Sequence, residues 1–311
     1  MLGPSISHPV TGKIVVPSTK TYYATPCFTT SIEGTIAAAG IVNDGTYEFG
    51  LTRGAVGSVV NWEIGEAGLS GTKHFTIGNT DGAHATVKAA ADFTIAARID
   101  QYRKLTLDTA GYTIMIGDGQ NGAIIPITPD AQAPEYYLTA FAGSGVVVAN
   151  YDVSASGFAS RSGPLAVQDG ATLALKSGTN LGTGLLTVED GATLKVSESG
   201  TVTLAGDLAI EDGAALAFNW TLARTVPRLA LASGKTLTLG DDKRLKVEVS
   251  STCGKPNGGE HLLTGCGGGF AGATLVPAPV GDAAKWVEGV SLKDGEIAAD
   301  IKRQGMLVIV F

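Results

Sequence analysis

Apolar and polar residues alternate along most of this chain, and the alternation is organised in repeating units. Each unit reads apolar-x-apolar, two or three polar residues, glycine, and a second apolar-x-apolar half. A period of two places the apolar side chains on one face of a short strand and the polar ones on the other. The glycine favours a tight bend between the halves, because it adopts positive φ without steric cost. Four units align without gaps, at 165–175, 186–196, 208–218 and 229–239.

The spacing of the units distinguishes between two all-β architectures. Their glycines, Gly170, Gly191, Gly213 and Gly234, lie 21, 22 and 21 residues apart. A sandwich has no reason to repeat one sequence at a fixed step, whereas stacked coils place like residues above like. A coil of this length accommodates three short strands at roughly 3.3 Å per residue, with their corners. We therefore predict an all-β fold: a single right-handed parallel β-helix with about 21 residues per coil, a terminal capping segment and minimal helix.

Weaker copies of the unit, at 41–49, 105–116 and 290–301, extend the prediction to most of the chain. The proline-containing segment 126–136 is expected to bulge from the helix as a loop, and the glycine-rich segment 251–281 interrupts the pattern.

The predicted organisation has three parts. Residues 1–60 form N-terminal coils or a cap, residues 61–250 form the β-helix with its clear repeats at 165–239, and residues 251–311 form a glycine-rich boundary and C-terminal capping strands. A cap is expected because a solenoid must cover its last coil to stay soluble.

Equivalent positions of the units predict which side chains stack. Leu173, Leu194, Leu216 and Leu237 share one position and are expected to form one buried ladder, beside an exposed Lys195. Three acids are expected to stack at one corner and to cap the Asp-Gly turns through their own backbone amides, because no lysine or arginine alternates with them as in a catalytic groove. These acids are Asp169, Asp190 and Asp212.

Charge and hydropathy exclude some functional classes. The chain has 22 basic and 29 acidic residues, a net charge of −7, and no basic run longer than two residues. A surface that follows nucleic-acid phosphates is therefore not expected, nor is a polybasic membrane anchor. No apolar run is long enough for a transmembrane segment. No signal peptide is visible at the amino end, so any export signal is expected upstream.

Motifs that would carry chemistry are weak. The glycines at 117–122 match a dinucleotide-binding string, but the following prolines exclude the helix that such a site needs, so we predict a turn. His74 and His84 could face one another from neighbouring strands, yet two imidazoles without a third ligand do not make a metal site. We therefore expect no catalytic, cofactor-binding or metal-binding residues, no cofactor and no enzymatic activity.

Two residue types leave alternatives open. Trp62, Trp220 and Trp286 are expected to pack in the core or at corners, with glycan stacking on Trp220 as the alternative. Cys253 and Cys266 either form a disulfide across the glycine-rich segment or remain thiols; Cys27 is distant in sequence.

Several segments resemble a known group of proteins. The unit at 186–196 and the linker 177–184 resemble autotransporter-associated β-strand repeats of bacterial surface proteins. Segment 260–270 resembles the stretch that closes such arrays, and 62–95 resembles the preceding coils in autotransporter-like proteins of gut Verrucomicrobia and their relatives. The resemblance covers residues 60–311 and implies a β-helix used as a surface scaffold or adhesive stalk.

We accordingly expect a non-enzymatic, secreted or cell-surface scaffold, an adhesin-like passenger whose partners are host or bacterial surface glycans or proteins. Because some other β-helices are polysaccharide lyases or hydrolases, a carbohydrate-active enzyme is one alternative. A simple glycan-binding module is another.

Overall fold

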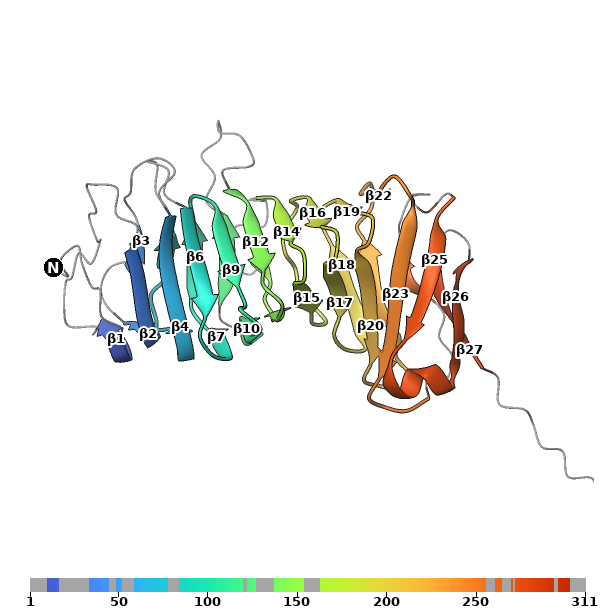
Figure 1. Ribbon diagram of the computed structural model, residues 1–311, viewed down its shortest axis with the longest axis horizontal. Coiled ribbons are helices and arrows are strands. Elements are labelled where there is room, and N and C mark those ends of the chain that lie inside the picture. The colour runs from blue at the N-terminus through green and yellow to red at the C-terminus, as the bar shows by residue number, and fades with distance from the viewer. Residues whose placement is uncertain are drawn as a thin grey trace, which may run out of the picture.

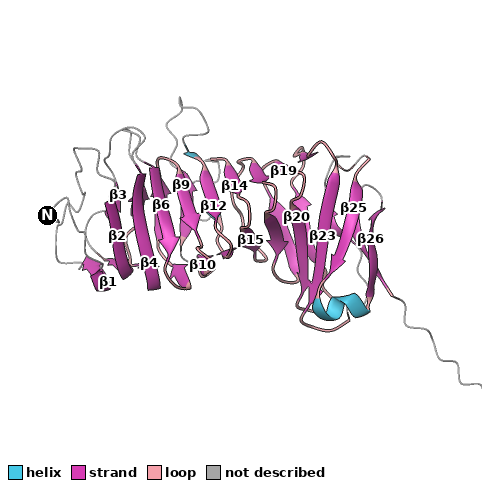
Figure 2. Ribbon diagram, viewed as in Figure 1, coloured by secondary structure: helices cyan, strands magenta, loops and turns pink. Residues whose placement is uncertain are grey.

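The protein is an elongated stack of short strands, through which the chain progresses from one end to the other (Figure 1). The computed structural model describes residues 10–16, 34–44, 49–51, 59–77, 84–119, 122–126, 137–153, 163–255, 261–264, 270, 272–293 and 296–302. No α-helix occurs in these residues, and the 3-10 helix η3 (Gly281–Lys285) lies near the C-terminal end (Figure 2). The all-β prediction is confirmed.

Two long parallel ladders run along the stack, and in each of them a strand pairs with its equivalent one coil later. Face 1 consists of β6 (His84–Ala89), β9 (Leu105–Asp108), β12 (Thr139–Ala142), β14 (Leu165–Val167), β16 (Leu186–Val188), β19 (Leu208–Ile210) and β22 (Leu237–Leu239). Face 2 consists of β7 (Phe93–Ile95), β10 (Thr113–Ile116), β13 (Val146–Ala149), β15 (Thr172–Leu175), β17 (Thr193–Val196), β20 (Ala215–Trp220), β23 (Arg244–Ser251) and β25 (Thr274–Pro279).

Face 3 closes each coil and has two separate parallel ladders. The N-terminal one consists of β3 (Phe49–Leu51), β5 (Phe75–Ile77), β8 (Arg98–Gln101) and β11 (Ala123–Pro126). The C-terminal one consists of β18 (Gly200–Leu204), β21 (Pro227–Leu231) and β24 (His261–Thr264). Between them, Asp152 and Asn180 form an isolated parallel bridge.

Both ends of the stack differ from its middle. At the N-terminal end, the long strands β2 (Gly34–Asn43) and β4 (Val59–Ser70) pair with each other. Strand β4 pairs with β6 on face 1 and, through Leu69, with β7 on face 2, while β1 (Val10–Val16) pairs with β2. At the C-terminal end, β24 pairs antiparallel with β27 (Glu296–Ile301), which pairs antiparallel with β26 (Val287–Lys293). The parallel order therefore ends in a hairpin.

The register confirms the parallel β-helix. Leu165, Leu186, Leu208 and Leu237 stack in one column of face 1, at steps of 21, 22 and 29 residues. The predicted coil length thus holds for the regular coils and is exceeded where a turn is longer. The handedness of the helix stays a prediction. The loop predicted at 126–136 begins where β11 ends, at Pro126, and its remaining residues lie outside the described part of the chain.

Inward side chains of the three faces fill one continuous core. Leu173, Leu194 and Leu216 are in register on face 2 and are at most 1% exposed, as the repeat predicts. The prediction that Leu237 continues this column is wrong: Val247 pairs with Leu216, and Leu237 pairs with Leu208 on face 1.

The reason is that the unit at 229–239 bends at a different corner. Its first half lies in β21, which pairs with β18 on face 3, and only its second half reaches face 1. An apolar-x-apolar, glycine, apolar-x-apolar pattern fits any corner of the coil, so it does not specify which two faces it joins.

The glycine-rich segment 251–281 contributes two strands to the stack. Strand β24 extends face 3, and β25 extends face 2 by one further coil. After these strands, the indole ring of Trp286, which follows η3, contacts the indole ring of Trp220 edge-on, with ring centroids 5.9 Å apart. The coils therefore continue to Pro279, and the apolar end of the core is covered by the residues that follow.

Candidate functional site

The acids of the Asp-Gly units stack at the corner between faces 1 and 2. Asp169 and Asp190 follow β14 and β16 in consecutive coils. A Cβ atom placed on Gly191 would overlap Asp169 Oδ1, and one placed on Gly213 would overlap Asp190 Oδ1. Each carboxylate therefore lies directly against the glycine of the next coil, which only a residue without a side chain permits. The predicted stacking is confirmed.

Two carboxylates at this corner, those of Asp212 and Glu211, accept hydrogen bonds from a neighbouring coil. Asp212 accepts hydrogen bonds from the backbone N–H of Asp242, at 3.2 Å to each oxygen, and Glu211 Oε2 accepts one from Asp190 N at 3.3 Å. The donors lie one coil away, so the prediction of bonds within the same turn is wrong for Asp212. Because turns of consecutive coils stack, the nearest free N–H groups of the next coil are within reach of these short side chains.

A further acid shows the same use of charge at the corner between faces 3 and 1. Asp207 Oδ1 accepts hydrogen bonds from the backbone N–H of Thr236 at 2.8 Å and from its hydroxyl at 3.0 Å. These bonds lower the pKa of Asp207, because they favour the charged form. Glu198 likewise accepts a bond from Ser177 N at 3.0 Å, 21 residues away.

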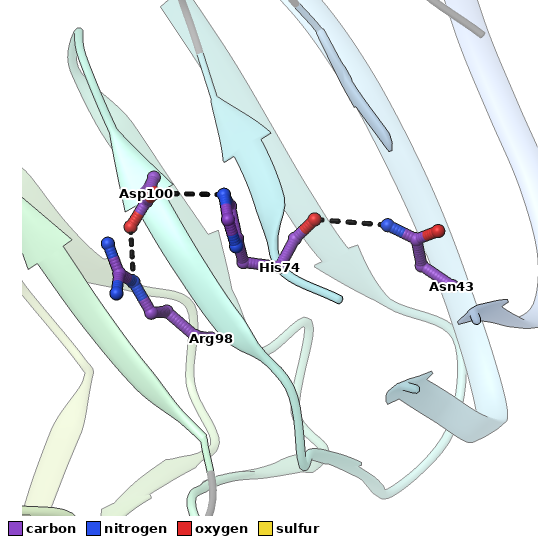
Figure 3. Close-up of polar contacts among 4 residues, drawn as sticks. All are labelled: Asn43, His74, Arg98 and Asp100. Atoms are coloured by element: carbon purple, nitrogen blue, oxygen red, sulfur yellow. Dashed lines mark hydrogen bonds and ion pairs between the residues drawn. The ribbon is translucent and has the colours of Figure 1, made fainter. Parts of the chain in front are cut away.

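A cluster of charged side chains lies on face 3, near the N-terminal end (Figure 3). Arg98 and Asp100 both project from the outer side of β8, because Ile99 between them is fully buried in the core. His74 immediately precedes Phe75, which pairs with Ile99 one coil later. The sequence separation of these residues therefore brings His74 beside Arg98 and Asp100.

The geometry of this cluster is centred on a buried carboxylate. Asp100 Oδ1 lies 2.5 Å from Arg98 Nε, and Asp100 Oδ2 lies 3.3 Å from His74 Nε2. The side chain of Asp100 is 5% exposed, whereas those of Arg98 and His74 are 31% and 30% exposed. The side-chain amide of Asn43 donates a hydrogen bond to the His74 carbonyl at 3.0 Å. A buried carboxylate needs such partners to offset the loss of water.

A histidine–carboxylate pair beside an arginine has recognisable chemical capacities. A carboxylate beside an imidazole is an arrangement that suits proton transfer. The arginine can bind a carboxylate or sulfate group. Among the described residues, no group of three or more His, Cys, Asp or Glu side chains is placed to hold a metal ion. The local sequence pattern does not reveal this cluster. Arg98 and Asp100 flank an apolar residue on one strand, but their position beside His74 depends on the length of the intervening coil.

His84 lies on a different face from His74. It begins β6 on face 1, whereas His74 adjoins β5 on face 3, so the two imidazoles do not face one another as their sequence spacing would have allowed. Burial lowers the pKa of His84, and the positive charges of Lys104 and Arg103 lower it further. Folding therefore favours the neutral imidazole at this position.

Buried polar side chains also connect coils. Gln101 Nε2 donates hydrogen bonds to the carbonyls of Tyr137 and Leu138, at 3.1 Å each, and Gln101 Oε1 accepts one from the Thr139 hydroxyl at 2.6 Å. Gln101 and Thr139 are fully buried. These hydrogen bonds join the end of β8 to the residues that lead into β12 in the next coil.

The tryptophans pack in the core. Trp62 and Trp220 are fully buried, and Trp286 is 5% exposed. Glycan stacking on Trp220 is therefore wrong, and the core-packing alternative is confirmed.

The other motifs have local roles. Gly117 and Gly119 have positive φ, and the segment leads into strand β11 as the predicted turn requires. Cys253 is a free thiol whose Sγ lies 3.4 Å from Ser251 Oγ, as the alternative of unpaired thiols predicts. Cys27 and Cys266 lie outside the described residues.

Comparisons with known proteins add no assignment. No protein-family model matches the chain, and neither a curated protein nor a solved structure does so. Within the described residues, no helix has the length and apolar character needed to cross a membrane.

Proposed function

We propose that this protein is a non-enzymatic, secreted or cell-surface β-helical scaffold, an adhesin-like passenger that presents a long regular surface to glycans or proteins. The observation that carries the proposal is that acids at the corners of the coils bond to the backbone of a neighbouring coil. Asp207 and Asp212 accept hydrogen bonds from backbone N–H groups of another coil, so these carboxylates stabilise the stack of coils. The resemblance of the repeats to autotransporter-associated repeats supports the same role and the extracellular location.

Turnover and binding measured on the same glycans test this proposal. Purified protein is incubated with pectins, alginate and mucin glycans, and both new reducing ends and new unsaturated uronates are measured. The scaffold predicts no turnover with any of them, and binding to a surface glycan or protein on an array. Reproducible turnover that a single substitution abolishes would contradict it.

A second candidate function, a carbohydrate-active enzyme, is favoured by the His74–Asp100–Arg98 cluster. The cluster joins a group suited to proton transfer with one suited to an acidic sugar, as a lyase or hydrolase of anionic polysaccharide would need. The variants His74→Gln and Arg98→Gln are compared with Lys293→Gln, at an exposed lysine of the C-terminal hairpin. An enzyme predicts turnover that is lost in the first two variants and kept in the third. A purely structural cluster predicts no turnover in any of them, and a lower melting temperature for the cluster variants alone.

A further inference from the structure

Three basic side chains meet where face 3 turns into face 1, near the N-terminal end of the stack. His84 begins β6, and Arg103 and Lys104 lie in the turn that leads from β8 into β9. Ala85 pairs with Leu105 one coil later, and Ala85 N donates a hydrogen bond to Lys104 O at 3.0 Å. The backbones of His84 and Lys104 are therefore neighbours in the ladder, about 4.8 Å apart.

The side chains of His84 and Lys104 project away from the core. Ala85 and Leu105, which follow them on the two strands, are at most 2% exposed and belong to the buried core. Successive side chains of a strand point to opposite faces, so the two basic side chains point outward. Both are half-buried, so a molecule that approaches face 1 can reach them.

Arg103 lies behind this pair and is held in a fixed position. It is 4% exposed, its Nη1 donates a hydrogen bond to the Tyr102 carbonyl at 2.9 Å, and its Cζ lies 5.9 Å from the centroid of the Tyr137 ring. A guanidinium keeps its charge at any physiological pH. Arg103 therefore contributes a permanent positive charge beneath the two outward side chains.

The positive charge of this corner is not balanced by acids on the paired strands. Within the part of the chain that the structure describes, no ion pair includes Lys104. The acids in register with β6 are Glu63 and Asp108, and both lie opposite Lys88. Lys88 is four residues beyond His84, about 13 Å along the strand. A positive potential of this kind attracts anions.

The imidazole of His84 retains hydrogen-bonding capacity for a ligand. Its Nδ1 is buried and has no hydrogen-bond partner. A proton on Nδ1 would therefore be buried unpaired, so the neutral ring carries its proton on Nε2. In either protonation state, Nε2 is then a donor that an anionic oxygen can accept.

A pair of hydroxyls lies beside the basic pair on the same face. Thr86 and Thr106 are in register, and both are half-buried. They occupy the next outward positions on β6 and β9, about 6.6 Å along the strands. Threonine hydroxyls both donate and accept hydrogen bonds, as sugar hydroxyls do. The combination favours an acidic sugar over an acidic peptide, which has few hydroxyls to offer.

We propose that His84 and Lys104, with the charge of Arg103 behind them, bind the acidic group of a glycan, either a uronate carboxylate or a sulfate. Thr86 and Thr106 bind hydroxyls of the same sugar residue. The inference rests on the proposed role in binding surface glycans and specifies their class as acidic. The site lies on face 1, separate from the His74–Asp100–Arg98 cluster on face 3.

Binding at this site should depend on pH. Burial and the charges of Lys104 and Arg103 lower the pKa of His84, so its imidazole is neutral at pH 7 and becomes protonated in acid. Uronates and sulfates stay charged down to about pH 4. The affinity should therefore rise as the pH falls from 8 to 5.5, and a bound anion should raise the pKa of His84.

Calorimetric titration with defined tetrasaccharides tests the proposal. The probes are tetragalacturonate, a sulfated galactose tetrasaccharide and neutral galactotetraose. We expect at least one acidic probe to bind, and the preferred probe to identify the acidic group. Lys104→Gln should weaken this binding about tenfold or more, as loss of a charged hydrogen bond does. His84→Gln should remove the rise in affinity at pH 5.5. The matched control is Lys88→Gln, at an exposed lysine of the same strand, which should keep the wild-type affinity.

Three outcomes would overturn the proposal: acidic probes that bind no better than galactotetraose, tetraglutamate that binds as tightly as the acidic sugars, or equal weakening by Lys88→Gln. If a variant lacks the cooperative melting transition of the wild type, the pKa of His84 is measured by NMR in the wild type, and an unchanged pKa at saturating acidic probe contradicts the site. Glycan binding that both variants keep would overturn this site alone, whereas turnover of a glycan would contradict the scaffold itself.

Discussion

At the scale of single residues, the inside and outside of each strand differ sharply in their contribution to stability. Leu194 is 1% exposed and lies between Leu173 and Leu216, whereas Lys195 projects outward on the same strand. Replacing Leu194 with alanine should cost about 2–5 kcal/mol, through lost burial and the cavity left behind. Replacing Lys195 with alanine should change stability by no more than about 0.5 kcal/mol. Denaturant unfolding of both variants checks this, and equal costs would contradict the assigned faces.

The pKa of Asp207 gives a second prediction at this scale. Since hydrogen bonds from Thr236 lower this pKa in the folded state, the stabilisation is present above the unfolded value of about 3.9 and is lost as the pH falls through the folded pKa. Asp207→Asn should therefore have a lower melting temperature than the wild type at pH 7, with a difference that shrinks in acid. The control Asp241→Asn replaces an exposed acid of a neighbouring turn. A deficit of Asp207→Asn that is the same at pH 7 and pH 3 would disagree with this account.

At the scale of the strands and corners, a second glycine column fixes the spacing of the coils. Gly163, Gly184 and Gly206 precede β14, β16 and β19, and a Cβ on each of the last two would overlap the carbonyl oxygen of the glycine one coil earlier. Backbone atoms cannot rotate away as side chains do. Gly206→Ala should therefore cost about 1–3 kcal/mol, as overpacking does.

The control for Gly206→Ala is Gly289→Ala. A Cβ at Gly289 meets Asp300 Oδ2 at 3.8 Å, an ordinary contact, so this variant should stay within about 0.5 kcal/mol of the wild type. Chemical denaturation measures both. If Gly206→Ala is as stable as its control, the coils do not approach as closely as the glycine column requires.

Sequence periodicity predicts where the strands lie along the chain better than it predicts which strands pair with one another. The constant step from Gly170 to Gly213 identifies the stacked coils and the buried column of Leu173, Leu194 and Leu216. It misplaces Leu237, because the intervening coil is longer and the motif fits every corner alike. The glycine column at 163, 184 and 206 shares the same period, and that period was its only signal in the sequence.

At the scale of the whole molecule, the candidate site depends on distances that a local pattern does not contain. Arg98 and Asp100 are recognisable as outward neighbours on one strand, but His74 joins them only through the register between β5 and β8. The buried state of Asp100 and of the three tryptophans is likewise a property of the assembled stack. The class of fold could therefore be predicted from the sequence, while the face 3 cluster could not.

The central claim is that the protein is a stack of equivalent coils, and removal of one coil tests it most directly. Deletion of residues 172–192 joins Ala171 to Thr193 and lets β17 take the place of β15 against β13, because Thr172 and Thr193 are in register. Deletion of residues 172–181 removes about half a coil and displaces every following strand to a different face. Thermal unfolding followed by circular dichroism is measured for both. We predict a cooperative β-sheet transition for the whole-coil deletion and its loss for the half-coil deletion; equally cooperative unfolding of the two, or loss of structure in both, would contradict the account.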